Sequence, residues 1–170
     1  TGKGAINISG AGTIQSATGV GVNAQAIGSG NVSINLSGQI QGSTAGIYAG
    51  SNGGDVTVNA TGVVTGNDAI VATTKGVGAV TVTTGAGKVT GATGDGIDVS
   101  TVNGWATVNV GEGGVSGARS GVAAVTTGTG AIKVQVHGDV SGGTDFGVAA
   151  ATTSGSIQID LDAGKFIAGG

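Results

Sequence analysis

Asn31-Val32-Ser33-Ile34-Asn35-Leu36-Ser37-Gly38-Gln39-Ile40-Gln41-Gly42 is the stretch that decides the fold of this protein. Apolar and polar residues alternate up to Leu36, which is typical of a β-strand with one buried face. Gly38 then separates this strand from a shorter apolar-polar step at Ile40, and Gly42 follows it directly. The stretch therefore predicts two short strands joined by a sharp corner.

The same pattern returns along the whole chain. Its first glycine recurs every 24 to 26 residues, always two residues before an apolar residue, at Gly12, Gly38, Gly62, Gly87, Gly113, Gly138 and Gly164. A period of this length is typical of a solenoid, in which each repeat forms one coil stacked on the previous one. The chain is therefore expected to form about seven coils in a single domain over residues 1–170.

Each coil has three short strands in this interpretation. The first strands alternate strictly and cover residues 5–9, 31–36, 55–59, 79–83, 106–110, 132–136 and 157–161. The second strands place one residue inward, at Ile14, Ile40, Val64, Val89, Val115, Val140 and Phe166. The third strands place two residues inward, the pairs Val22/Ala24, Ile47/Ala49, Ile70/Ala72, Ile97/Val99, Val122/Ala124 and Val148/Ala150. The predicted fold class is all-β, a single-stranded parallel β-helix, or β-solenoid.

Two features of the corners lead to further expectations. A second glycine follows the second strand in five coils, at Gly42, Gly66, Gly91, Gly117 and Gly142. We expect glycines on both sides of this strand because a sharp corner favours positive φ, which costs glycine no steric penalty. Phe166 stands where the other coils have Ile or Val, and we expect it to help close the last coil.

The composition agrees with a narrow, stacked rod. The chain has 39 glycines, no proline and only 2% aromatic residues, and its glycines lack the three-residue period of collagen. Only six Lys and Arg residues and a net charge of −3 give no basic patch for nucleic acid. Apolar stretches are short and interrupted, so no direct membrane insertion by this segment is expected. The absence of cysteine excludes disulfides and is compatible with export.

A family resemblance rests on two motifs that recur in most coils. Gly38-Gln39-Ile40-Gln41-Gly42 and the following Gly46-Ile47-Tyr48-Ala49 resemble the repeats of bacterial autotransporter passenger domains, and the likeness covers nearly the whole chain. The resemblance implies a right-handed parallel β-helix, exported by type V secretion and forming part of a longer passenger region. Two-partner-secretion haemagglutinins, phage tailspikes and pectin-degrading enzymes share this coil architecture.

The sequence offers little support for catalysis. Asp68 and Asp95 fall at the same corner of adjacent coils, where they would share a cation or raise one pKa, or else act as solvated turn residues. His137 is the only histidine, and no nucleophile can be paired with it by spacing. Gly53-Gly54-Asp55 is a single copy of a calcium-repeat element that needs many copies. We therefore predict a protein that is not an enzyme, with no catalytic, cofactor-binding or metal site.

Two residues are the candidate surface contacts. Tyr48 is expected to point outward from the third strand of the second coil, and Trp105 lies at the first corner of the fifth. They are too far apart to hold one sugar ring together. Ice binding would need outward Thr-x-Thr pairs on successive coils, but only Thr81 and Thr83 form one on the first face. The consecutive pairs Thr73-Thr74 and Thr126-Thr127 cannot both face outward on one strand.

The expected function follows from the rod and the resemblance together. We expect a surface-exposed or secreted structural or adhesive stalk at the bacterial outer membrane, and a glycan-binding or ice-binding solenoid is the alternative. The expected partners are a host-cell or extracellular-matrix receptor, or other copies of the rod, since open solenoid ends expose unpaired strands.

Overall fold

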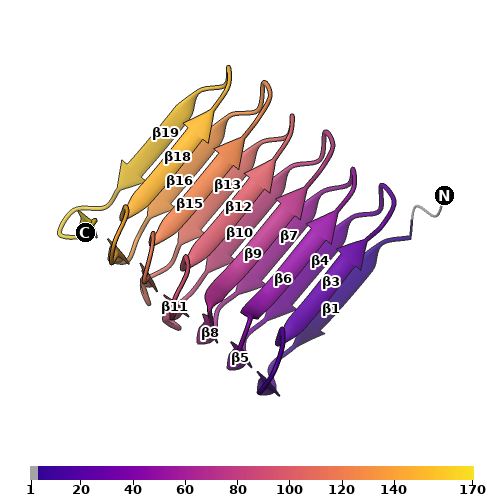
Figure 1. Ribbon diagram of the computed structural model, residues 1–170, viewed down its shortest axis with the longest axis horizontal. Helices are drawn as coiled ribbons and strands as arrows, with labels where there is room; N and C mark the ends of the chain where they lie inside the picture. The colour runs from indigo at the N-terminus through magenta and orange to yellow at the C-terminus, as the bar shows by residue number, and fades with distance from the viewer. Residues whose placement is uncertain (1–3) are drawn as a thin grey trace.

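The structure is a computed structural model, and it describes residues 4–170 (Figure 1). These residues form one continuous stack of coils built from strands and turns, without a helix. The strands lie side by side along the rod, with the N-terminus at one end and the C-terminus at the other (Figure 1). The predicted all-β solenoid of about seven coils with three strands each is confirmed.

Three parallel sheets run the length of the stack. The first sheet comprises β1 (Ile6–Gly10), β4 (Val32–Leu36), β7 (Val56–Ala60), β10 (Val80–Thr84), β13 (Ala106–Val110), β16 (Ile132–Val136) and β19 (Ile157–Leu161). The second sheet comprises β2 (Ile14–Ser16), β5 (Ile40–Gly42), β8 (Val64–Gly66), β11 (Val89–Gly91), β14 (Val115–Gly117), β17 (Val140–Gly142) and β20 (Ile167–Ala168). The third sheet comprises β3 (Val22–Ala26), β6 (Ala45–Ser51), β9 (Asp68–Thr74), β12 (Ile97–Thr101), β15 (Val122–Thr126) and β18 (Val148–Thr152).

Equivalent residues of successive coils pair directly, which creates columns of similar side chains. In the first sheet Ile34 pairs with Val58, and Val82 pairs with Val58 from the other side. All three are fully buried in the core. Burial of each such side chain contributes roughly 1.5–3 kcal/mol by transfer estimates. The alternation in the sequence thus assigns alternate residues of every strand to the interior.

The reason for most glycines of the two columns differs from the predicted one. Among the described residues, positive φ is found only at Gly114 and Gly164, so the expected left-handed backbone holds at Gly164 and does not explain the other corner glycines. A Cβ atom on Gly87 would instead overlap the backbone of Gly62 in the coil before, and a Cβ atom on Gly91 would overlap the backbone of Asp95. From Gly38 to Gly142 these corners need glycine because neighbouring backbone segments approach too closely for any side chain, whereas a Cβ atom at Gly12 or Gly164 would meet no atom within 4 Å.

A third glycine column lies just before the first sheet and was missed in the sequence. From Gly54 onward, a Cβ atom would overlap the equivalent glycine of the preceding coil at Gly54, Gly78, Gly104, Gly130 and Gly155. The signal was present, because these glycines recur with the same period as the other two columns.

A column of buried hydroxyl groups lines the inside of the same corner. Ser51, Thr74, Thr101 and Thr126 are nearly inaccessible to solvent. Ser51 Oγ donates to Gly30 O at 2.9 Å, and Thr74 Oγ1 donates to Gly54 O at 3.1 Å. Thr74 is the last residue of β9 and Thr126 the last of β15, and both side chains face inward. This agrees with the expectation that the two residues of a consecutive threonine pair cannot both face outward.

The last coil corrects the prediction for Phe166. Val140 of β17 pairs with Ile167, not Phe166, so the register has shifted by one residue. Ile167 packs against the core, while the Phe166 side chain is 52% exposed. A shift of one residue moves a side chain to the opposite face of a strand. Phe166 therefore does not close the coil, and Ile157, Ile159 and Leu161 of β19 remain partly exposed.

Candidate functional site

The outer face of the first sheet is polar along its whole length. Strand pairing aligns its outward side chains in two columns, one of Asn7, Ser33, Thr57, Thr81, Thr107, Lys133 and Gln158 and one of Ser9, Asn35, Asn59, Thr83, Asn109, Gln135 and Asp160. Some neighbours bond along the column, as Asn59 Nδ2 does to Asn35 Oδ1 at 3.1 Å. Lys133 Nζ lies 3.9 Å from Asp160 Oδ2. Thr81 has threonine on both sides, Thr57 and Thr107, whereas Thr83 lies between Asn59 and Asn109, so the Thr-x-Thr pair is not repeated in the adjacent coils.

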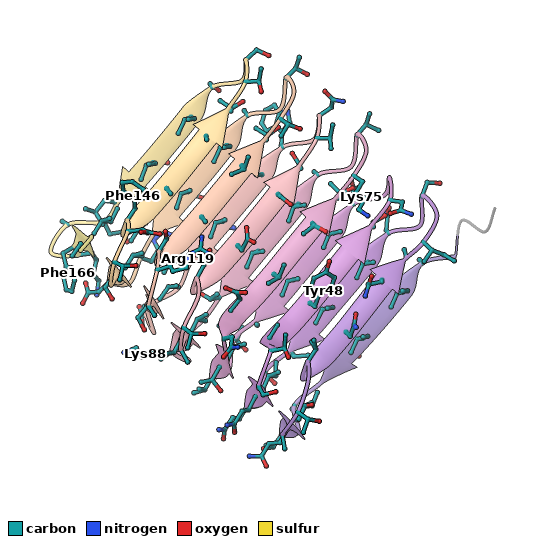
Figure 2. The ribbon with its side chains drawn as sticks, in the orientation of Figure 1. Tyr48, Lys75, Lys88, Arg119, Phe146 and Phe166 are labelled. Atoms are coloured by element: carbon teal, nitrogen blue, oxygen red, sulfur yellow. The ribbon has the colours of Figure 1, made fainter. Side chains whose placement is uncertain are left out.

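Tyr48 lies on the outer face of the third sheet, as expected (Figure 2). It borders a small hollow. The hollow has a volume of about 50 Å³ and lies between coils one, two and three. Its lining consists of Gln25, Ala26, Ile27, Tyr48, Gly50, Ser51, Asn52, Thr73 and Lys75. Of these residues only Tyr48 was a sequence candidate, because the others come together only when three coils stack.

Trp105 lies at the corner that leads into β13, and its side chain is 66% exposed. The equivalent positions in the coils before and after are Ala79 and Ala131. The backbone pairing shows this, because Val80 N donates to Trp105 O and Ala106 N donates to Ala131 O. Small neighbours leave the indole uncovered. The structure does not bring Trp105 and Tyr48 together, since they belong to different coils and Trp105 lies outside the third sheet.

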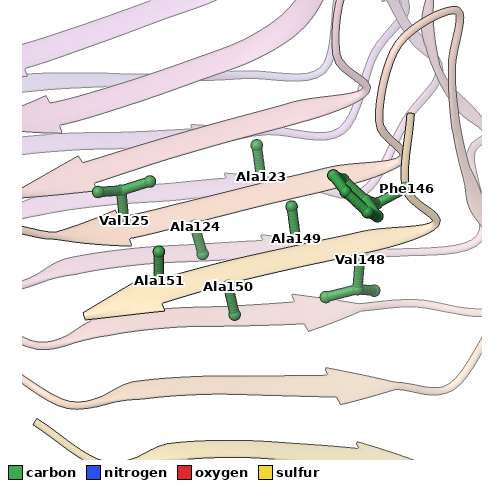
Figure 3. Close-up of a pocket in the computed structure, with 8 residues that line it drawn as sticks. All are labelled: Ala123, Ala124, Val125, Phe146, Val148, Ala149, Ala150 and Ala151. Atoms are coloured by element: carbon green, nitrogen blue, oxygen red, sulfur yellow. The ribbon is translucent and has the colours of Figure 1, made fainter. Parts of the chain in front are cut away.

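Phe146 is an exposed aromatic residue that the sequence reasoning missed. It precedes β18, is 62% exposed and lies at one end of an apolar hollow of about 400 Å³ (Figure 3). The rest of the lining is Ala123, Ala124, Val125, Val148, Ala149, Ala150 and Ala151 of β15 and β18. The sequence does contain a sign of this hollow, because the outward positions of β15 and β18 are Ala and Val instead of polar residues.

A third hollow, of about 240 Å³, lies on the outside of the second sheet. It includes Ser116 and Ser141 of adjacent strands together with Lys88, Glu112 and Phe166. The shifted register of the last coil places Phe166 there.

Asp68 and Asp95 do lie at one corner of adjacent coils, and both carboxylates bind backbone. Asp95 N donates to Asp68 Oδ1 at 2.8 Å, and Ser120 N donates to Asp95 Oδ1 at 2.9 Å. Arg119 Nη2 lies 3.5 Å from Asp95 Oδ2. Each carboxylate thus holds an amide of the next coil, a stacking role that sequence spacing alone did not indicate. No group of three or more residues suited to hold a metal ion occurs among residues 4–170.

Asp98 is the acidic group whose ionisation the fold affects most clearly. Burial raises the pKa of Asp98 above its ordinary value of 3.8, and the like charges of Asp95 and Asp68 raise it further, while Arg119 opposes them. At a pH between 3.8 and the raised pKa, Asp98 is therefore protonated in the folded state and ionised in the unfolded state. Stability must fall as pH rises through the interval between 3.8 and the raised pKa.

We therefore expect Asp98→Asn to increase the free energy of unfolding at pH 7. The gain should disappear at about pH 3, where Asp98 is protonated in both states. Urea unfolding at the two pH values measures the difference. An equal effect at both would mean that packing, and not charge, explains the change.

His137 forms a surface contact with the following coil. Its Nδ1 lies 2.8 Å from Asp162 Oδ2, and both side chains are about half exposed. This arrangement places a histidine and a carboxylate together, but on an open surface beside β16.

Comparisons with known proteins identify no relative of this chain. No protein-family model, no curated protein and no solved structure is significantly similar to this chain. No helix long and apolar enough to cross a membrane is found within residues 4–170.

Proposed function

We propose that this protein is a structural and adhesive stalk of the autotransporter passenger type, displayed at the bacterial surface or secreted. The observation that carries the proposal is the uninterrupted stack of coils with polar outer columns on its first sheet. Such a stack serves to hold a binding surface at a fixed distance from its point of attachment.

The physical basis of the proposal is stiffness. Backbone hydrogen bonds join the first six coils along three sheets and the seventh coil to the sixth along two, so bending the rod requires breaking bonds on one side. Buried Val and Ile columns run through the same axis. Outward Asn, Thr and Gln side chains offer hydrogen bonds to water or to a partner without an apolar patch on the first sheet.

The proposal includes the absence of enzymatic activity. It is supported by the surface position of the only histidine, whose partner is Asp162, and by the backbone-binding role of Asp68 and Asp95. A hydrolase or lyase activity measured with the purified chain would overturn this part.

The test is binding of the purified chain to host cells and to immobilised extracellular-matrix proteins. The wild type is compared with Trp105→Ala and with Tyr48→Ala, two exposed aromatic positions on different parts of the rod. Saturable binding that either change abolishes would assign adhesion to this chain. Binding by neither variant nor wild type would leave a spacer whose adhesive function lies elsewhere.

Self-association of rods is a second expected partnership. Ile159 of β19 pairs with the inward residue Val134 of β16, and it is 44% exposed. We expect a chain of residues 1–170 to associate end to end with rising concentration, because another coil would cover this surface. Ile159→Lys should abolish the association, whereas Gln158→Lys, on the outward side of the same strand, should not. Sedimentation velocity measures it, and equal association by both variants would contradict this mode.

The alternative of ice binding has less support. An ice-binding face needs the same threonine pair on successive coils, whereas the first sheet follows Thr81 and Thr83 with Thr107 and Asn109. The alternative of glycan binding is favoured by a specific feature, the hollow beside Tyr48.

A further inference from the structure

The fold does not require glycine at position 50. Gly50 lies within β6, between Gln25 of β3 and Thr73 of β9 in the outward column of the third sheet. An added Cβ atom would meet only ordinary contacts, at 3.6 Å from Thr73 Oγ1 and Tyr48 Cε1 and 3.7 Å from Gln25 Cγ. Its φ is not positive. Glycine weakens a strand interior and often marks a place where another molecule approaches the backbone.

The missing side chain creates the hollow beside Tyr48. Tyr48, Gln25 and Thr73 surround Gly50, and Asn52 and Lys75 complete the rim. The volume of about 50 Å³ exceeds the roughly 10–15 Å³ that one water needs, but it is smaller than a whole sugar ring. It therefore suits one edge of a ring, while the exposed part of Tyr48 offers an aromatic surface for the ring's apolar face.

The polar groups of the rim are held in place. Gln25 Nε2 donates to Asn23 Oδ1 at 2.8 Å, and Asn52 Nδ2 donates to Ile27 O at 2.7 Å. These bonds fix the two amides and leave their carbonyl oxygens to accept from ligand hydroxyls. Groups whose positions are fixed beforehand lose less freedom when a ligand binds.

The charge of the rim favours an anion. Lys75 is the only charged residue that lines the hollow, and within residues 4–170 its ammonium makes no ion pair. A carboxylate is the group that a single ammonium on the rim of an otherwise neutral hollow would attract.

We propose that the hollow formed by Gln25, Tyr48, Gly50, Asn52, Thr73 and Lys75 binds an acidic sugar. The ring face lies on Tyr48, its hydroxyl edge enters the hollow above Gly50, and its carboxylate meets Lys75. The site does not depend on surface display, so its failure would leave the stalk proposal standing.

The chain offers a direct probe, because Tyr48 is its only tyrosine. Protein labelled with 3-fluorotyrosine gives one ¹⁹F NMR signal, which reports on the hollow alone. The ligands are methyl β-glucuronide and methyl β-glucoside, which differ only at C6, where the first has a carboxylate and the second a hydroxymethyl group. We expect a saturable shift with the glucuronide and at least about tenfold weaker binding of the glucoside.

Two variants make the experiment decisive. Gly50→Thr places in the hollow the residue that the next coil carries at Thr73, and it should abolish the saturable shift while the protein stays folded. Lys75→Gln should reduce glucuronide binding to the level of the glucoside, whereas Lys133→Gln, on the first sheet, should leave it unchanged. Increasing salt should weaken glucuronide binding in the wild type.

The proposal is overturned if neither glycoside produces a saturable shift, or if Gly50→Thr binds as tightly as the wild type. Equal affinity for both glycosides in the wild type would overturn the assignment to acidic sugars. If Gly50→Thr did not fold, the comparison of Lys75→Gln with Lys133→Gln would still decide, since equal binding by both contradicts the proposed site.

Discussion

Val58→Asp is expected to unfold the middle of the rod. Val58 is fully buried and stacks between Ile34 and Val82, so the carboxylate would have no partner and no water. Burying an unpaired charge costs several kcal/mol even after the group takes up a proton. We expect a loss of more than about 4 kcal/mol in the free energy of unfolding. Because each coil contacts only its neighbours, the adjacent coils should melt with it.

The matched control is the adjacent residue. Thr57 faces outward from the same strand, and Thr57→Asp places the same carboxylate in solvent. Its effect should stay within about 0.5 kcal/mol. Urea unfolding followed by circular dichroism compares the two, and similar losses would contradict the inward and outward assignment of β7.

Gly87→Ala is the second large effect that we expect. The three atoms nearest to the added Cβ are backbone atoms of Gly62 and Val63 in the preceding coil, and none of them can rotate away. The coils must separate locally, which breaks hydrogen bonds between them. We expect a loss of about 2–4 kcal/mol.

Gly50→Ala provides the control for this change. The same methyl group at Gly50 meets only side chains, at 3.6 Å or more, and a strand residue other than glycine has less conformational freedom to lose on folding. The variant should therefore be neutral or more stable by up to about 1 kcal/mol. Thermal unfolding of the two variants tests whether close backbone approach, and not positive φ, explains the glycine columns. Equal melting temperatures would refute that explanation.

The candidate site could be predicted only in part. Tyr48 was found because an aromatic residue is rare in this chain and its strand alternates clearly. Lys75 and Asn52 were not, because they follow different strands and meet Tyr48 only through the stacking of coils. Phe146 could not be predicted because it precedes β18, and the apolar hollow beside it forms only where β15 and β18 pair.

The sequence by itself determined the period, the three strands of each coil and the inward residues of nearly all of them. It did so because a strand alternates its side chains and because a stacked coil repeats the same environment every 24 to 26 residues. These are properties of residues near one another in the chain.

Only the tertiary structure decided why glycine is needed at each corner, where Phe166 and Ile167 point, and which side chains surround Gly50. Each of these depends on the distance between atoms of different coils. A change of one residue in register, or of a fraction of an ångström in backbone approach, alters the outcome, and the order of residues along one coil contains no measure of either.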